Sequence, residues 1–208
     1  VLTTYDMSGF AGASTAVTVA ATAVDLSAVT LTGSAGAKDT VTVTTNNSNF
    51  AVKSMTGVET LAINAAGGAT TFDFSKTSGI TLVKTNDDDT ARDVTLTDLT
   101  DGTSVEIEVG TTNSGVIVDM ANKANAGNTL DLKVKTVAAA GNVIDIDVDE
   151  VEQTTIYMDT AATLDLAGLS MTTGTSTLKL TGDSAGPISA LHADVTTVDA
   201  SGMIGGGA

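Results

Sequence analysis

The chain of 208 residues contains no cysteine, which excludes disulfides and thiolate metal sites. It has a single proline, no tryptophan and only 3% aromatic residues, so its turns depend on Asn, Asp and the 21 glycines. The chain has one histidine, His192, and one arginine, Arg92. Histidine-based nucleophilic catalysis would therefore have to depend on His192 alone. The sequence therefore favours a structural or binding role, and we expect no enzymatic activity.

Cationic residues are also scarce, with nine Lys and Arg against 25 Asp and Glu and a net charge of −16. Nucleic-acid binding needs basic patches, so this balance disfavours a nucleic-acid partner and favours cations. No apolar run approaches the roughly 20 residues of a membrane-spanning helix, and the first residues show no signal-peptide pattern. We expect no transmembrane segment.

A short motif recurs along the chain. Leu2–Phe10 and Val195–Met203 share one pattern: an apolar residue, two threonines, an apolar residue, Asp, a small or apolar residue, Ser, Gly and an apolar residue. The chain therefore begins and ends in the same type of repeat, and we expect it to be a segment of a longer protein. A reduced form, apolar-Asp-apolar, is centred on Asp25, Asp73, Asp119, Asp131, Asp145 and Asp165.

Such a triplet fits a β-strand, in which alternate side chains take opposite faces and the carboxylate points outward. Repeats of about 20 residues without helical periodicity predict an all-β fold, a parallel β-solenoid of short strands. Tandem antiparallel β-sandwiches are the alternative, because their strand and turn signals are similar. No proline-rich or charged linker divides the chain, so residues 1–208 are interpreted as a single continuous domain.

Alternation of Val, Leu and Ile with Thr marks the individual strands. The segments concerned are 16–19, 29–31, 41–43, 58–63, 80–83, 94–96, 105–109, 155–158 and 178–180, together with the motif copies around Asp131, Asp145 and Asp165. Met120–Lys123 and Ser189–Ala193 could each form one helical turn.

Acidic residues concentrate in two places, which are candidate calcium sites. The first contains Asp87, Asp88 and Asp89; the second contains Asp145, Asp147 and Asp149. Strand alternation places the second set on one face about 6.6 Å apart, where neighbouring charges repel by roughly 0.6 kcal/mol per pair in water. A bound cation would offset this repulsion, and hard carboxylate oxygens favour calcium. The alternative is a solvated acidic face.

Two further features have a structural interpretation. Gly33–Val41 resembles, with one residue inserted, the G-G-x-G-x-D-x-U-x repeat that binds calcium in RTX proteins. We expect this segment to form a glycine-rich corner that leads into a strand. His192 lies between Leu191 and Ala193, and we expect it to be half-buried and structural.

Taken together, Gly36–Val43, Gly57–Ile63, Leu180–Asp183 and Val195–Met203 resemble the repeats of RTX-type bacterial surface-layer (S-layer) proteins of the Caulobacter kind. They also resemble repeats of large RTX adhesins. The first resemblance implies a right-handed parallel β-solenoid, type I secretion to the cell surface, and calcium-dependent assembly into a two-dimensional lattice of identical subunits. Anchoring to an outer-surface glycan or lipopolysaccharide would lie outside this segment. We therefore expect a structural surface-layer segment, with an adhesin repeat region or a β-helix carbohydrate-active enzyme as alternatives.

Overall fold

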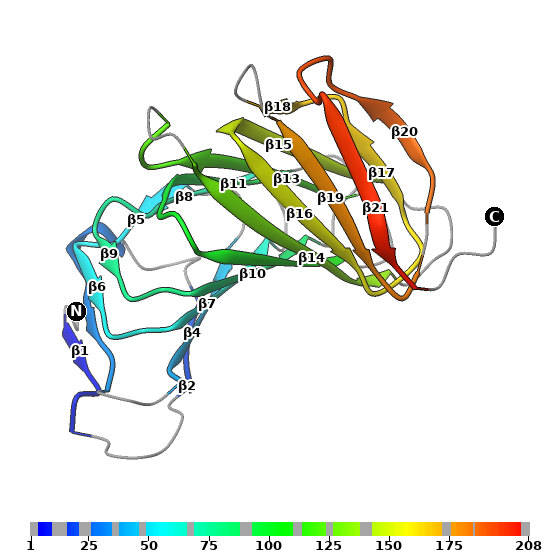
Figure 1. Ribbon diagram of the computed structural model, residues 1–208. Coiled ribbons are helices and arrows are strands. Elements are labelled where there is room, and N and C mark those ends of the chain that lie inside the picture. Colours follow the sequence, from blue (N-terminus) through cyan, green and yellow to red (C-terminus); the bar gives the residue numbers. More distant parts are fainter. Residues whose placement is uncertain are drawn as a thin grey trace.

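The computed structural model describes residues 4–9, 16–20, 26–34, 38–45, 49–65, 69–87, 93–109, 114–123, 127–137, 143–171, 176–184 and 186–204. Short strands are stacked along one axis, and β1 and β21 lie at opposite ends of the stack (Figure 1). Apart from one 3-10 turn, η1 (Leu26–Ala28), every regular element of the described residues is a strand.

The strands form three sheets. Sheet A contains, in spatial order, β1 (Thr4–Asp6), β3 (Thr30–Thr32), β6 (Ser54–Thr56) and β9 (Thr77–Ser78). Sheet B contains β2 (Ala16–Ala20), β4 (Thr40–Thr45), β7 (Thr60–Ala65), β10 (Leu82–Asp87), β12 (Ser104–Val109), β14 (Thr129–Val137), β16 (Gln153–Met158), β19 (Thr177–Gly182) and β21 (Thr197–Met203). Sheet C contains β20 (Ile188–Leu191), β17 (Thr163–Leu166), β15 (Val143–Val151), β13 (Ser114–Met120), β11 (Asp93–Leu99), β8 (Thr70–Asp73) and β5 (Asn49–Ala51), with β18 (Leu169–Met171) also paired to β15.

Strand pairing shows that the fold is a parallel β-solenoid. Each pairing among the described strands of sheet B is parallel and joins residues one coil apart. The length of the coil varies, because the coil from Thr40 to its partner Thr60 is shorter than the coil from Ser104 to its partner Asp131. This arrangement confirms the predicted fold class and differs from the antiparallel pairing that β-sandwiches would require.

The cross-section of the stack changes along its length. From β3 to β9, the chain passes through sheets A, B and C in turn, so these coils have three sides (Figure 1). From β10 onward, strands of sheets B and C alternate, except that β17 and β18 both belong to sheet C, and sheet A does not continue in the described residues. The two ends of the solenoid therefore have different shapes.

Aliphatic ladders form the core. In sheet B, the parallel register stacks Val41, Leu61, Val83, Val105, Leu132 and Ile156 directly above one another. Each is at most 2% exposed. In sheet C, Phe72, Leu96, Val118 and Val148 form a second ladder of buried residues. Burial of one such side chain contributes about 1.5–3 kcal/mol, so the ladders are the main source of stability.

The recurring aspartate motif behaves as predicted within its strands, because the flanking apolar residues are buried and the aspartates are not. The carboxylates of Asp145 and Asp131 face solvent, whereas their apolar neighbours are buried. The copies at the two ends of the chain occupy different sheets, since Tyr5 pairs with Leu31 in sheet A and Val198 pairs with Leu178 in sheet B. The motif therefore does not mark a fixed position in the coil.

What several motif copies share is a turn. In each, the aspartate Oδ1 accepts the backbone N–H of the residue two positions later. The pairs are Asp6 with Ser8 at 2.9 Å, Asp73 with Ser75 at 2.8 Å, Asp165 with Ala167 at 3.1 Å and Asp199 with Ser201 at 2.9 Å. At the ends of β1, β8 and β17 this Asx turn lets the chain change direction without proline or a long loop. Asp199 instead lies within β21, where the pairing with β19 is irregular.

The strands expected from Val, Leu, Ile and Thr alternation are confirmed, although the structure extends or shifts most of them slightly. The helical turn expected at Ser189–Ala193 was wrong, because Ile188–Leu191 is strand β20, paired with β17. At the other expected helical turn, Met120–Lys123, residues 121–123 form a hydrogen-bonded turn after β13.

Candidate cation-binding face of sheet C

The outer face of sheet C carries the second predicted acidic cluster. Within β15, Ile146 and Val148 are buried in the core, whereas Asp145, Asp147 and Asp149 point outward. The predicted alternation along this strand is therefore confirmed. For the first cluster, Asp87 ends β10 but its side chain is outside the described residues, and Asp88 and Asp89 are outside them altogether.

Parallel register adds carboxylates that the sequence did not reveal. Asp149 pairs with Asp119 of β13, and Asp145 pairs with Asp165 of β17. Neighbouring strands lie about 4.8 Å apart, closer than the 6.6 Å or so between alternate residues of one strand. Cross-strand pairs are therefore the closest acidic neighbours on this face. Neither Asp119 nor Asp165 was among the predicted site residues.

The pair of Asp119 and Asp149 is bridged by a lysine ammonium group. Lys123 Nζ lies 2.9 Å from Asp119 Oδ1 and also contacts Asp149 Oδ2. Hydrogen bonds to Asp149 and then to Asp119 raise the pKa of the Lys123 ammonium above its usual range. Lys123 therefore offsets the repulsion between the two carboxylates. The turn after β13 brings Lys123 next to Asp119, a contact that the sequence did not predict.

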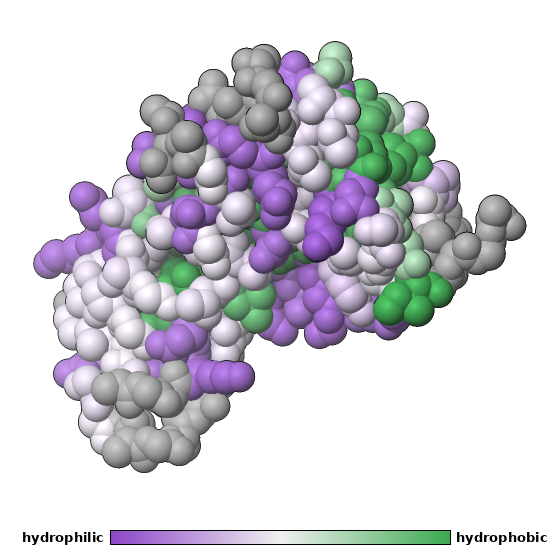
Figure 2. Space-filling model, viewed as in Figure 1, coloured by the Kyte–Doolittle hydropathy of each residue, from purple (hydrophilic) through white to green (hydrophobic). Residues whose placement is uncertain are grey.

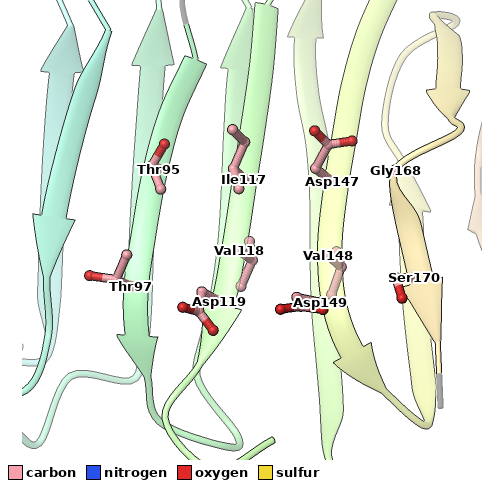
Figure 3. A pocket seen from close by; sticks show the side chains of 10 residues that line it. All are labelled: Thr95, Thr97, Ile117, Val118, Asp119, Asp147, Val148, Asp149, Gly168 and Ser170. Atoms are coloured by element: carbon pink, nitrogen blue, oxygen red, sulfur yellow. The ribbon is translucent and has the colours of Figure 1, made fainter.

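A shallow groove of ≈ 380 Å³ runs across the same face, between β11, β13, β15 and the turn before β18. Figure 3 shows Asp119 and Asp149 side by side on neighbouring strands, with Thr97 on one side and Ser170 on the other. At the far side, Gly168 packs so closely against Asp147 that an added Cβ would lie 1.5 Å from its Oδ1. The groove thus combines carboxylates and hydroxyls on a rigid sheet.

The arrangement fits carboxylate pairs better than a closed metal cage. Within the ranges that the structure describes, no group of three or more Asp, Glu, His or Cys side chains is placed to hold one metal ion. Asp145, Asp147 and Asp149 follow one another along a strand instead of converging on one point. A calcium ion on this face would therefore be shared between two carboxylates and complete its coordination with water.

A second charged cluster, which sequence reasoning missed, lies on the outer face of sheet B. Glu106 of β12 is only 8% exposed, and its Oε1 accepts hydrogen bonds from Lys84 at 2.8 Å and Lys135 at 3.0 Å. Burial alone would raise the pKa of the Glu106 carboxyl, but the two lysines outweigh it and hold the pKa below its usual range. The lysines are 22 and 29 positions from Glu106 in the sequence, so only the coil register brings the three together.

The glycine-rich segment Gly33–Val41 leads into β4, as expected. The side chain of its aspartate, Asp39, points into the interior. Asp39 is fully buried, and its Oδ2 accepts hydrogen bonds from the backbone N–H of Ser34 and, at 2.9 Å, from the Ser34 hydroxyl. The Asp39 backbone N–H donates to Glu59 Oε2 at 2.7 Å. Asp39 therefore stabilises the turn before β4 and links it to the next coil.

His192 is half-buried, as expected, and its contacts are local. Its Nδ1 accepts the backbone N–H of Asp194 at 3.2 Å, and its own backbone N–H donates to the carbonyl of Leu166 at 3.0 Å. These contacts tie the turn after β20 to the preceding coil.

The fold places the chain in the class of parallel β-solenoid repeat proteins, with outer faces of threonine and charged residues. No protein-family model, curated protein or solved structure gives a significant match to it. The described residues contain no helix long and apolar enough to cross a membrane.

Proposed function

We propose that the chain is a structural segment of a self-assembling bacterial surface layer. The observation that carries this proposal is the parallel stacking of successive coils into an elongated body. In such a body each inner strand is hydrogen-bonded to a strand on both sides, and its aliphatic side chains stack on those of its neighbours. The resemblance of the repeats to RTX-type surface-layer proteins supports the same role.

The remaining parts of the proposal follow from that resemblance. The protein would be exported by a type I system, act at the cell surface as identical subunits in a two-dimensional lattice, and have no catalytic activity. Its anchor to a surface glycan or lipopolysaccharide would lie outside residues 1–208. The high negative charge and the Thr-rich outer faces are compatible with a hydrated extracellular surface.

The alternative is the repeat region of a large adhesin, for which a stiff spacer is equally suitable. A lattice subunit needs complementary patches that propagate by symmetry, whereas an adhesin presents its binding region as a separate rod. Electron microscopy of the purified protein with calcium distinguishes the two. Sheets with a regular repeat support the surface layer, whereas dispersed rods contradict it and favour the adhesin.

Calcium is a separate part of the proposal. We propose that calcium stabilises the segment by binding between outward carboxylates, with Asp145, Asp147 and Asp149 of sheet C and Asp87, Asp88 and Asp89 as ligands. The carboxylate of Asp165, which pairs with Asp145 across the strands, supports a site at the Asp145, Asp147 and Asp149 cluster. An ion bound only to the folded state, at one hundred times its dissociation constant, adds about 2.7 kcal/mol to the free energy of unfolding.

Melting curves with chelator, magnesium, calcium and sodium chloride at matched ionic strength test this. Calcium should raise Tm more than magnesium or salt, and Asp145→Asn/Asp147→Asn and Asp87→Asn/Asp88→Asn should each reduce that increment. Asp131→Asn/Glu108→Gln, which removes two charges from sheet B, is the matched control and should keep it. Equal effects of calcium and salt would show charge screening alone and remove the metal assignment.

A further inference from the structure

A groove of ≈ 350 Å³ lies on the outer face of sheet B. It crosses β10, β12, β14, β16 and β19, and sheet B continues on either side of it with β7 and β21. Over the middle of the stack, hydrophilic side chains lie among side chains of intermediate hydropathy (Figure 2). The volume is near the lower end of the range of about 300–1,000 Å³ that is typical of small-molecule sites. The outward side chains that line the groove include Glu106, Asp131, Lys133, Thr155, Tyr157 and Thr181.

Tyr157 gives the groove an aromatic wall. Phe72 and Phe74 are buried, and Tyr5 packs against the core. Tyr157 instead lies on the outer face of β16, where its hydroxyl donates a hydrogen bond to Asp183 Oδ2 at 3.3 Å. This contact helps to hold the ring in place beside the groove. Such a ring suits a ligand that is apolar on one face and polar at its rim.

Lys133 provides a hydrogen-bond donor next to this ring. Lys133 and Tyr157 are register partners on β14 and β16, and the lysine Nζ is 5.1 Å from the ring centroid. Its ion pair with Asp159 is loose, at 3.7 Å. An ammonium group has three hydrogens to donate. Lys133 can therefore donate to a ligand without giving up a close carboxylate contact.

Two carboxylates provide acceptors. Both hydrogen bonds that the described residues donate to Glu106 go to Oε1, so Oε2 is available to accept another. The Asp131 side chain is exposed, and its register partners are the hydroxyl residues Ser104 and Thr155. The groove is thus built from two adjacent rows that run across the strands: Ser104, Asp131 and Thr155 in one, and Glu106, Lys133, Tyr157 and Thr181 in the other.

These groups fit a saccharide, because sugar hydroxyls both donate and accept hydrogen bonds and the C–H face of a sugar ring can pack on an aromatic side chain. An apolar peptide or a lipid would bury the carboxylates of Glu106 and Asp131 without new partners, at a cost in free energy. The net charge of −16 repels an acidic polymer. Around the groove itself, three lysines balance three carboxylates, which favours a neutral ligand: Lys84, Lys133 and Lys135 with Glu106, Glu108 and Asp131.

We propose that the groove binds a neutral oligosaccharide that lies across β12, β14, β16 and β19. One sugar ring packs against Tyr157, its hydroxyls donate to Glu106 Oε2 and to the Asp131 carboxylate, and Lys133 donates to a sugar oxygen. The site adds a ligand to the structural role proposed above. It does not depend on that role, because every residue of the groove belongs to one chain.

Tyrosine fluorescence tests the binding, because the chain has no tryptophan and two tyrosines. In Tyr5→Phe, which keeps the ring that packs against the core, Tyr157 is the remaining tyrosine. Titration with millimolar cellohexaose, maltohexaose, mannohexaose and chitohexaose should change its emission for at least one of the four. Hexagalacturonate, an acidic chain of the same length, should bind at least tenfold more weakly. No response to any neutral chain, or tighter binding of the acidic one, overturns the proposal.

Variants tested by calorimetry with the best neutral chain locate the site. Tyr157→Ala and Asp131→Asn should each weaken binding at least tenfold, whereas Tyr157→Phe keeps the ring and should retain most of the affinity. Gln153→Ala on the same strand and Glu108→Gln, which also removes one carboxylate, lie outside the groove lining and are the controls. Far-UV circular dichroism confirms that each variant is folded. If Tyr157→Ala binds like the parent, or the controls lose as much affinity, the groove is not the site.

Discussion

The aspartates of the repeated motif act first as turn residues. Asp6, Asp73, Asp165 and Asp199 each accept a backbone N–H two positions later. For Asp6 and Asp199, hydrogen bonds from the following serine, its side chain first and its backbone second, lower the pKa of the carboxyl. An aspartate can therefore recur at this position for the sake of the turn, without any metal.

Replacement of Asp73 tests the turn. Asp73→Ala removes the acceptor for the Ser75 N–H and should lower the free energy of unfolding by about 1 kcal/mol. Asp73→Asn keeps an acceptor oxygen and should recover most of the loss. Thr71→Ala, an outward residue on the same strand, is the control for urea unfolding. If Asp73→Ala costs no more than Thr71→Ala, the turn does not contribute to stability.

Glu106 should make stability depend on pH. Its folded-state pKa is lowered, so its contribution is complete above the unfolded-state value near 4.5 and is lost as the pH falls through the folded-state value. We expect Glu106→Gln to cost about 1 kcal/mol at pH 7, since two lysines lose their carboxylate. The difference from the parent should shrink below pH 4.5. Melting curves from acidic to neutral pH measure it, and a difference that stays constant would contradict the lysine pairing.

At the scale of the strand, sequence alternation predicted the ladders, and Thr154 is one of several buried polar residues that interrupt them. Thr154 of β16 is fully buried between Leu130 and Leu178 of the neighbouring strands, and its Oγ1 has no hydrogen-bond partner. A buried hydroxyl without a partner costs roughly 1–3 kcal/mol. This position is therefore a weak point in the core.

Thr154→Val should stabilise the protein, because it replaces the hydroxyl with a methyl group of similar size. We expect the free energy of unfolding to rise by about 1 kcal/mol. Thr155→Val changes the next, outward residue of the same strand and serves as the control. Guanidinium unfolding compares the two, and a destabilised Thr154→Val would mean that the hydroxyl is satisfied in solution.

Strands with clear alternation were predictable and short ones were not. β15, with Asp and aliphatic residues in strict succession, could be recognised directly from the sequence. β20 has apolar residues at 188 and 191, a spacing that also suits a helical turn, and only pairing with β17 decides for a strand. The carboxylate pairs Asp119 with Asp149 and Asp145 with Asp165 could not be predicted, because variable coil length hides the register.

At the scale of the whole molecule, the coil is the unit that can be removed. Leu82 pairs with both Thr60 and Ser104, so residues 82–103 span one complete coil. Deletion of this segment would place β12 on β7 and β13 on β8, with Val105 on Leu61 in the ladder. Nearest-neighbour stacking predicts that the shortened chain still folds.

This deletion should give a protein with a single cooperative unfolding transition and the same circular dichroism per residue as the parent. Deletion of residues 82–92 alone removes β10 but keeps β11, which breaks the alternation of sheets B and C, and should abolish cooperative unfolding. If both deletions behave alike, the coil is not the folding unit.

Parallel pairing across coils also determines how the molecule would respond to force. The first and last strands, β1 and β21, lie at opposite ends of the stack (Figure 1), and the backbone hydrogen bonds between coils run along the line that joins them. Tension between the termini would therefore open these bonds one row at a time instead of shearing a whole sheet. Since an extended chain spans about 3.3–3.6 Å per residue, each released coil would lengthen the molecule by more than ten times the spacing of its strands. We expect such a segment to unfold coil by coil and to absorb mechanical work at each step, before the protein as a whole breaks.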